Sequence, residues 1–170
     1  MSLTVNEPLS YIGSRLVRAP DYEERPRIRK PEDAALFLHD KISEGLDREI
    51  FGVICLSPSG HVNHSEIVSV GTVESALADP RAVYKAALLS SAAAVILFHT
   101  HPTSVQNGPS LDDLKVTVRM IEAGQIMEVR VLDHLILNDE GWFSFQEAAG
   151  EETIEDFCRK QIEEREENKE

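Results

Sequence analysis

An uninterrupted apolar run, Ala92 to Phe98, leads directly into His99-Thr-His101-Pro102. The length of the run and its polar boundaries favour a buried strand, although periodicity alone does not separate a strand from a buried helix segment. Residues two apart on a strand point to the same side, so we expect His99 and His101 to project together from its end. Pro102 cannot continue a sheet ladder, and the strand should stop there.

A helix is predicted soon after this strand. Apolar residues recur at the spacing of one helix face from Leu111 to Ile121, and Pro109-Ser110 stands at the start of that pattern. Asp113 falls in the first turn, where its carboxylate can reach back toward the two imidazoles. Two imidazoles and one carboxylate suit zinc, whose catalytic sites commonly use three protein ligands. The spacing Ser110-x-x-Asp113 is also that of a capping box, and the two interpretations are not exclusive.

Glu66 is the candidate general base. The chain predicts a hairpin of two strands, Ile50 to Leu56 and His61 to Val70, joined by a turn at residues 57–60. The even-numbered side chains of the second strand are expected to face the core, with Glu66 in their middle. A buried carboxylate is costly unless it is paired, hydrogen-bonded or functional. His64, on the same face, is interpreted as a neighbour of the site or, more simply, as a buried structural histidine.

Together these residues resemble a known motif. His99-x-His101-Pro102 followed by Ser110-x-x-Asp113, with a glutamate on an upstream strand, is similar to the JAMM (MPN+) metalloprotease motif. Within that superfamily the chain resembles the RadC branch over about residues 32 to 147. Further similar stretches are Glu66-Ile-Val-Ser-Val-Gly71-Thr72, Pro80-Arg81 and Val131-Leu-Asp133-His134.

The resemblance implies both a fold and a chemistry. The implied fold is of the α/β (α+β) class, a mixed β-sheet flanked by helices in the JAB/MPN, cytidine-deaminase-like architecture. One zinc ion per chain is held by His99, His101 and Asp113, Glu66 activates water, and Ser110 helps to stabilise the oxyanion. The implied function is a zinc-dependent metallopeptidase or isopeptidase. Its expected partner is a protein or peptide substrate, of which a ubiquitin-like conjugate is one example, and the substrate's tail is expected to bind as an added strand.

The chain also departs from the family that it resembles. Seven residues separate Pro102 from Ser110 where the family usually has six, which places an insertion near residues 105–108. The insertion should leave the ligands unchanged and alter the shape of the substrate cleft. Full-length RadC proteins usually carry a helix-hairpin-helix module before this domain, and residues 1–30 are too few to hold one. The chain therefore resembles only the catalytic half.

Composition divides the chain into three parts. Residues 1–30 lack sustained periodicity, which indicates an irregular N-terminal arm or a poorly ordered terminus. Residues 31–150 form the predicted RadC-like JAB/MPN catalytic domain. Residues 151–170 are strongly acidic and are expected to form a helix that ends in a solvated tail of about eight residues. Asp133 and His134, in a predicted strand, are interpreted as structural, because a fourth protein ligand would close the metal site.

Charge and hydropathy narrow the classes of function. A length of 170 residues with 42% hydrophobic content fits one globular domain. The formal charge of −13 argues against direct duplex binding. A role in DNA transactions, the traditional label of RadC proteins, is therefore the second hypothesis, and a non-catalytic MPN scaffold is the third. Two cysteines without a disulfide framework, and no signal-peptide or membrane-spanning pattern, favour a cytoplasmic protein. The oligomeric state has no signature in the sequence.

Overall fold

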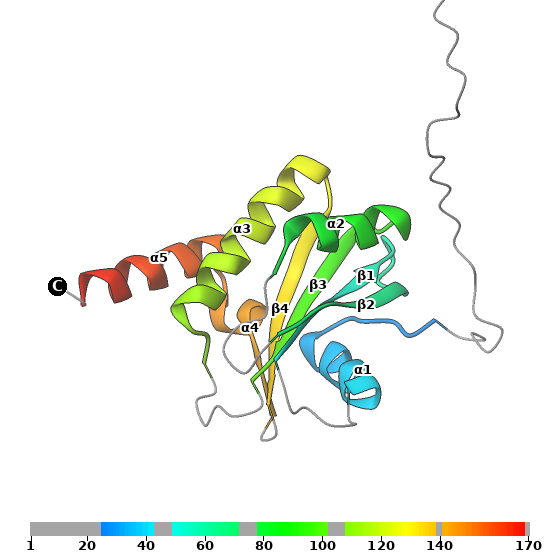
Figure 1. Ribbon diagram of the computed structural model, residues 1–170, viewed down its shortest axis with the longest axis horizontal. Helices are drawn as coiled ribbons and strands as arrows, with labels where there is room; N and C mark the ends of the chain where they lie inside the picture. The colour runs from blue at the N-terminus through cyan, green and yellow to red at the C-terminus, as the bar shows by residue number, and fades with distance from the viewer. Residues whose placement is uncertain (1–24, 43–48, 72–77, 102–107, 139–140, 169–170) are drawn as a thin grey trace, which may run out of the picture.

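The computed structural model describes residues 25–42, 49–71, 78–101, 108–138 and 141–168 (Figure 1). Within these ranges, no helix has the length and apolar character needed to cross a membrane. The elements in chain order are α1 Pro31–Ile42, β1 Ile50–Leu56, β2 Val62–Val70, α2 Pro80–Leu89, β3 Ala94–Thr100, α3 Leu111–Met127, β4 Arg130–Asn138, β5 Gly141–Ser144, α4 Phe145–Ala149 and α5 Ile154–Glu167.

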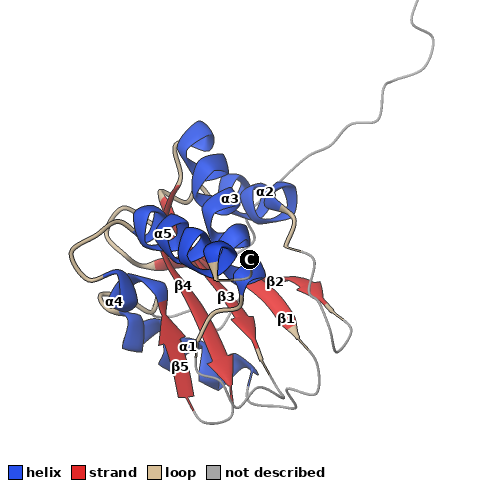
Figure 2. Ribbon diagram, turned by 90° about the vertical axis from the view of Figure 1, so that its left-hand side faces the viewer, coloured by secondary structure: helices blue, strands red, loops and turns tan. Residues whose placement is uncertain are grey.

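The strands form one mixed, five-stranded sheet in the order β2-β1-β3-β4-β5. β1 pairs antiparallel with β2 and β3, β3 runs parallel to β4, and β5 pairs antiparallel with β4. α1 covers one face of the sheet, and α2 and α3 cover the other, with α5 packed against α3 (Figure 1, Figure 2). The mixed sheet flanked by helices that the sequence predicts is thereby confirmed.

β3 occupies the centre of the sheet and is buried along its whole length, from Ala94 to Thr100. Burial on both faces explains why the run is apolar without alternation. Val95 and Leu97 belong to the core cluster beneath α2 and α3. His99 continues this series, because residues two apart on a strand share a face. The strand thus delivers His99 to the side of the sheet that α2 and α3 cover.

Local signals place several boundaries correctly. β1 begins and ends at the residues predicted for the first strand of the hairpin. Asp79 caps α2 by accepting a hydrogen bond from the backbone N–H of Arg81 at 2.9 Å, and Pro80 occupies the first helical position. The predicted strand stop at Pro102 and most of the predicted loop insertion lie outside the described residues.

β2 does not present the uninterrupted core face that the sequence predicts. It begins at Val62, and two register shifts interrupt its pairing with β1. A β-bulge sets two residues against one, and such a slip moves the side chains that follow to the opposite face. Val62 is buried in the cluster beneath α1, whereas Glu66 pairs with Val53 on the opposite face, and its side chain is 40% exposed. The expectation of one continuous core face from Val62 to Val70 is therefore wrong, and Glu66 is only half-buried.

The acidic C-terminal segment contributes a longer helix than predicted. Ile154 and Cys158 of α5 are buried in a cluster shared with α3. The sequence predicts a solvated tail of about eight residues, yet the helix continues to Glu167. Within that stretch Arg165 donates a hydrogen bond to the backbone oxygen of Pro109 at 2.8 Å. This tertiary contact holds the last turns of α5 against the start of α3.

Candidate metal centre

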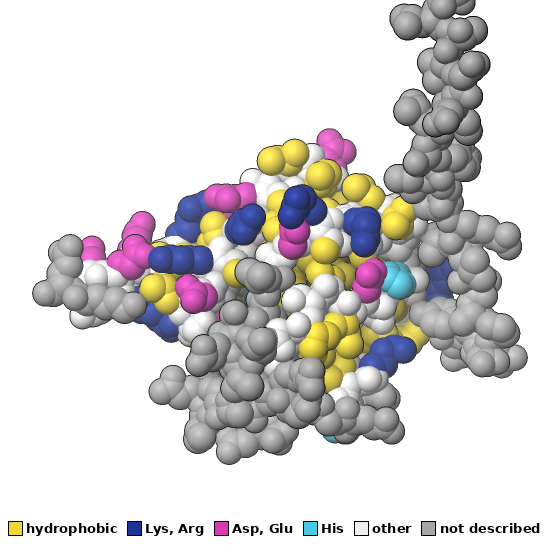
Figure 3. All heavy atoms as spheres, in the orientation of Figure 1, with side chains coloured by type: hydrophobic (Ala, Val, Ile, Leu, Met, Phe, Trp, Pro, Cys, Tyr) yellow, Lys and Arg dark blue, Asp and Glu magenta, His cyan; other side chains and the backbone are white. Residues whose placement is uncertain are grey.

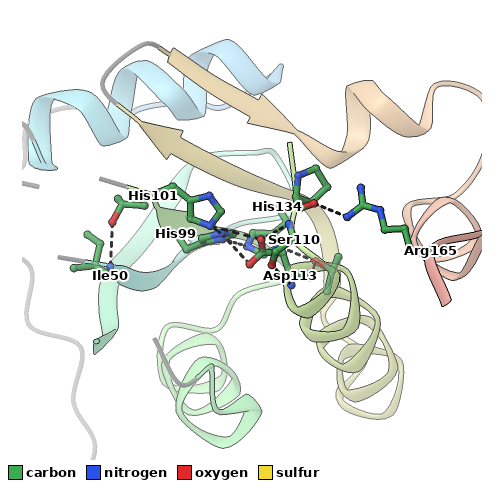
Figure 4. Close-up of polar contacts among 10 residues, drawn as sticks. Ile50, His99, His101, Ser110, Asp113, His134 and Arg165 are labelled. Carbon is green, nitrogen blue, oxygen red and sulfur yellow. Dashed lines mark hydrogen bonds and ion pairs between the residues drawn. The ribbon is translucent and has the colours of Figure 1, made fainter. Parts of the chain in front are cut away.

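Two imidazoles at the end of β3 and one carboxylate from α3 meet beside the sheet (Figure 4). Nε2 of His99 lies 2.9 Å from Nε2 of His101 and 3.1 Å from Oδ1 of Asp113. Nε2 of His101 lies 3.6 Å from Oδ2 of Asp113. One donor atom from each residue lies within 4.8 Å of the other two. The structure thus brings together the three side chains predicted as metal ligands.

The distances between these donors fit a small cation. A tetrahedral zinc ion with ligand bonds of about 2.0–2.2 Å sets its donors roughly 3.3–3.6 Å apart. The separations of 2.9, 3.1 and 3.6 Å lie close to that range. Three protein donors leave the fourth tetrahedral position to water or substrate, as in catalytic zinc sites. The donor set can therefore hold a metal ion.

The carboxylate of Asp113 both caps helix α3 and belongs to the cluster with His99 and His101. The backbone N–H of Ser110 donates to Oδ2 of Asp113 at 2.7 Å, and the backbone N–H of Asp113 donates to Oγ of Ser110 at 3.1 Å. These two bonds form the capping box of α3. The other oxygen, Oδ1, faces His99. The capping-box interpretation of the Ser110-x-x-Asp113 spacing is confirmed, and the cap fixes the direction in which the carboxylate points.

The electrostatic setting keeps these groups in the forms that bind cations. Burial raises the pKa of Asp113, but the hydrogen bond and charge of His99 and the bonds from Ser110 outweigh burial and hold it well below its usual range. Burial lowers the pKa of His101, and the neighbouring His99 acts in the same direction. An ionised Asp113 and a neutral His101 are the protonation states that metal ligation requires.

Behind His99 lies a second polar layer, made of His134, which the sequence predicts to be structural, and Thr117. Nδ1 of His99 lies 2.8 Å from Nε2 of His134, and Nδ1 of His134 lies 2.7 Å from Oγ1 of Thr117. Thr117 donates to the backbone oxygen of Asp113 at 2.6 Å. His134 and Thr117 are fully buried, and Phe145 stacks on the His134 ring with centroids 4.9 Å apart. Burial lowers the pKa of His134 well below its ordinary value, and the charge of His99 acts in the same direction.

Asp133, the neighbour of His134, has the structural role that the sequence analysis assigned to it. Its carboxylate accepts hydrogen bonds from the Ser144 hydroxyl at 2.7 Å and from the backbone N–H groups of His134 and Gln146 at 2.7 and 2.9 Å. These bonds join β4 to the β5–α4 corner. Burial raises the pKa of Asp133 to about 6, although all three bonds act to lower it.

Glu66, predicted as the general base, comes from a different part of the sheet than the cluster. It lies on β2, which β1 separates from β3. Among the described residues, its side-chain hydrogen bond is to His64, with Oε2 3.2 Å from Nε2. It shares a sheet face with the cluster, since it pairs with Val53, which packs beneath α2 and α3. Its catalytic role stays a prediction.

Ser110, predicted to stabilise an oxyanion, lies one turn from Asp113 and is exposed. Its Oγ accepts the backbone N–H of Asp113 through a lone pair, so the hydroxyl proton is left to donate elsewhere. This position is compatible with stabilisation of an oxyanion by Ser110, and that role stays a prediction.

Glu49 is a carboxylate near the cluster that the sequence analysis missed. β1 pairs with β3 so that Phe51 lies opposite His99, and continuing this antiparallel register sets Glu49 opposite His101. A hydrogen bond of 3.0 Å from the backbone N–H of Ile50 to Oγ1 of Thr100 supports that alignment. The charge of Glu49 also acts to raise the pKa of His101. The only feature of the sequence that marks Glu49 is its position directly before the buried strand β1.

A His-x-His pair at the end of a central strand and an aspartate in the first turn of the next helix, on a mixed sheet, define a JAB-type domain with a candidate metal centre. A family model described as the RadC-like JAB domain matches residues 28–151. Similar curated proteins are UPF0758 proteins of Bacillus cereus, Bacillus anthracis and Bacillus thuringiensis subsp. konkukian. Each is 35% identical over 136 residues, which cover 80% of this chain and 59% of the relative. The chain thus spans about three fifths of these relatives, and it belongs to the RadC-like JAB family.

Proposed function

We propose that this chain is a zinc-dependent hydrolase of the JAMM type that cleaves an amide bond in a peptide or an isopeptide. The observation that supports the proposal most is the convergence of donor atoms from His99, His101 and Asp113 within 4.8 Å. Three protein ligands are typical of catalytic zinc, whereas structural sites usually have four. Among the residues that the structure describes, no fourth histidine, cysteine or carboxylate joins the cluster.

The chain supplies groups for the remaining steps of amide hydrolysis. When bound, zinc polarises the scissile carbonyl and lowers the pKa of a coordinated water toward neutrality. The Ser110 hydroxyl, whose proton the helix cap leaves unused, donates to the developing oxyanion. A nearby carboxylate takes a proton from the attacking water and passes it to the leaving amine.

Two glutamates compete for the role of general base. A base must come within about 2.6–3.2 Å of its proton partner, directly or through one water. Glu66, the residue predicted from the sequence, lies two strands from His99 and is hydrogen-bonded to His64. Glu49 aligns with His101 across the β1·β3 pair and influences its pKa. We therefore place Glu49 ahead of Glu66 as the proposed base.

The proposed substrate is the extended tail of a protein or peptide, and a ubiquitin-like conjugate is one such substrate. Recognition through backbone hydrogen bonds tolerates varied side chains. A formal charge of −13 disfavours a phosphate-rich substrate and is compatible with a neutral amide chain. The proposed location is the cytoplasm, which agrees with two cysteines that are both free and buried.

A role in DNA transactions is the second candidate, and the surface does not favour it. Duplex binding requires a basic face that replaces counterions. Figure 3 shows lysine and arginine side chains interspersed with acidic ones over α3 and α5, without a basic stripe on that face. A non-catalytic scaffold is the third candidate, and the complete donor set argues against it.

The test is cleavage of a panel of peptides and ubiquitin-like conjugates by the full chain, with chelator and with restored zinc. We expect cleavage that vanishes with chelator and returns with zinc. Glu49→Gln should retain zinc and lose cleavage, while Glu66→Gln should retain both. The reverse pattern would assign the base to Glu66. Tight, zinc-independent binding to DNA with no amide cleavage would contradict the proposal.

A further inference from the structure

A polar pocket lies at the turn between β1 and β2, at the far end of β1 from the candidate metal centre. Phe51, near the start of β1, pairs with His99, whereas the turn follows Leu56 at the other end of the strand. The pocket has a volume of about 600 Å³, which is within the range of small-molecule sites. Its lining residues are Arg25, Ser57, Ser59 and His61. Small-molecule sites usually have a mostly apolar lining, so polar side chains throughout favour a charged ligand.

Backbone contacts hold the walls of this pocket in place. The backbone N–H of Ile28 donates to the backbone oxygen of Gly60 at 2.9 Å, and the Ile28 side chain belongs to the core cluster beneath α1. Gly60 has a φ of +81°, and a Cβ there would lie 2.8 Å from the backbone oxygen of Ile28. Glycine meets both demands of this turn. The contact fixes residues 25–28 beside the turn, and with them Arg25 and Arg27.

The two arginines of this segment bond to neutral acceptors. Nη1 of Arg25 donates to Oδ1 of Asn63 at 3.1 Å, and Nε of Arg27 donates to the backbone oxygen of Ser59 at 2.9 Å. Among the residues that the structure describes, neither guanidinium forms an ion pair with a carboxylate. Two positive charges thus lie together in a chain whose formal charge is −13. Most of the N–H donors of Arg25 are left for a ligand.

Ser57, Ser59 and His61 form a connected array along the wall of the pocket. Oγ of Ser57 lies 3.1 Å from Oγ of Ser59, which lies 2.9 Å from Nδ1 of His61. Each hydroxyl carries one proton, and the imidazole ring carries at least one. The two contacts use one proton each, whichever group donates. In every arrangement, at least one proton is therefore left for a ligand, on a hydroxyl or on the ring.

We propose that this pocket binds a phosphate monoester group, carried by a small molecule or by a phosphoserine residue. A monoester has three terminal oxygens and a charge of about −1.5 to −2 at neutral pH. The planar fork of Arg25 can donate to two of these oxygens, and the array of Ser57, Ser59 and His61 can donate to the third. A carboxylate, or the diester phosphate of a nucleic-acid backbone, offers only two free oxygens and a single charge. The donor set therefore favours a monoester over both.

The first test is titration of the full chain with inorganic phosphate, followed by amide NMR at about 0.15 M salt. We expect saturable shifts at residues 57–61, and the same shifts with a chelator present, because the pocket does not involve the metal centre. AMP, and a phosphoserine peptide compared with its unphosphorylated form, then identify the carrier of the group by the tighter binding. Cyclic AMP, a diester, should bind more weakly than AMP. Shifts that do not saturate, or equal binding of AMP and cyclic AMP, would overturn the inference.

The second test separates a specific site from general charge. Arg25→Gln should weaken phosphate binding at least about tenfold, as for loss of a hydrogen bond to a charged group. Arg81→Gln is the matched control, because it removes the same charge from an exposed arginine that pairs with Asp79 on α2, and it should leave the affinity unchanged. Arg25→Lys keeps the charge and loses the fork, so it should also weaken binding. Equal losses in Arg25→Gln and Arg81→Gln, or wild-type affinity in Arg25→Lys, would contradict the proposed site.

Discussion

The Asp113 carboxylate both caps α3 and contributes to the candidate metal centre. Replacing it with an amide separates these two functions. In Asp113→Asn the side-chain oxygen can still accept the Ser110 N–H bond that caps α3, now 2.7 Å long. The charge that attracts a cation is lost. We expect zinc affinity to fall at least about tenfold, as for loss of a ligand interaction, while far-UV circular dichroism stays unchanged.

The neighbouring carboxylate is the control for this substitution. Asp112 is exposed and lies outside the cluster. Asp112→Asn should keep wild-type zinc affinity. Zinc that is retained by Asp113→Asn and lost by Asp112→Asn would show that the predicted loop insertion shifts the register of the ligands.

Asp133 gives the stability of the fold a dependence on pH. Burial raises its pKa to about 6, above the ordinary value of 3.8, so the folded state binds more protons than the unfolded state between these values. Its contribution to stability is therefore fully present below the ordinary value and is lost as pH rises through about 6. The measurement is urea unfolding of wild type and Asp133→Asn from about pH 4 to 7. The stability of wild type relative to the variant should fall over that range, and a constant difference would contradict the assignment.

At the residue scale, the sequence predicts the ligands because their relation is local. His99 and His101 share a strand, and Asp113 lies in the first turn of the next helix. Glu49 and His134 reach the cluster only through the pairing of β3 with β1 and with β4. Those contacts join residues far apart in the chain, so spacing carries no signal for them.

β1 lies between β2 and β3 in the sheet, and Gly52 leaves room there for the ring of Phe98. A Cβ at this position would lie 2.2 Å from Cζ of Phe98 and 2.7 Å from the backbone oxygen of Glu66. We expect Gly52→Ala to lower the free energy of unfolding by about 1–3 kcal/mol, the usual cost of overpacking. Urea unfolding measures the change.

Gly108→Ala is the matched control, because a Cβ there meets nothing within 4 Å among the described residues. Its effect should stay within about 0.5 kcal/mol, as for ordinary surface changes. Equal effects of the two substitutions would show that the close approach at Gly52 does not contribute to stability.

At the element scale, local chemistry predicts where helices start and how long strands are. Irregularities such as β-bulges depend on pairing between strands. The Asp79-Pro80 start of α2 and the extent of β1 can be read from the sequence. The bulges in β2 cannot, because they arise from how its side chains fit against β1. The uninterrupted alternation assumed for β2 placed Val62 and Glu66 on one face, whereas the bulge sets them on opposite faces.

For the whole molecule, the net charge is the property that bears most directly on DNA binding. The chain carries a formal charge of −13 and belongs to the RadC-like JAB family. At about 0.15 M salt, charges are screened beyond roughly 8 Å, so weak attraction by a few arginines should not sustain DNA binding. Fluorescence anisotropy with short duplex and single-stranded DNA should show no saturable binding in that buffer. Tight binding would require a basic surface that the described residues of Figure 3 do not display on the face shown.

The overall fold follows from the sequence mainly through the resemblance carried by the metal motif. Periodicity predicts most strands and helices, but the order β2-β1-β3-β4-β5 has no signature in composition. The helix α5 illustrates the limit: the sequence predicts a helix that ends in a solvated tail of about eight residues, but the helix continues to Glu167 and packs against α3.

The most direct measurement for the central claim is anomalous X-ray diffraction at the zinc edge from crystals of the full chain grown with zinc. One anomalous peak per chain should lie within about 2.0–2.2 Å of Nε2 of His99, Nε2 of His101 and a carboxylate oxygen of Asp113. A peak at other residues, or zinc-soaked crystals in which these three side chains bond only to one another, would contradict the account.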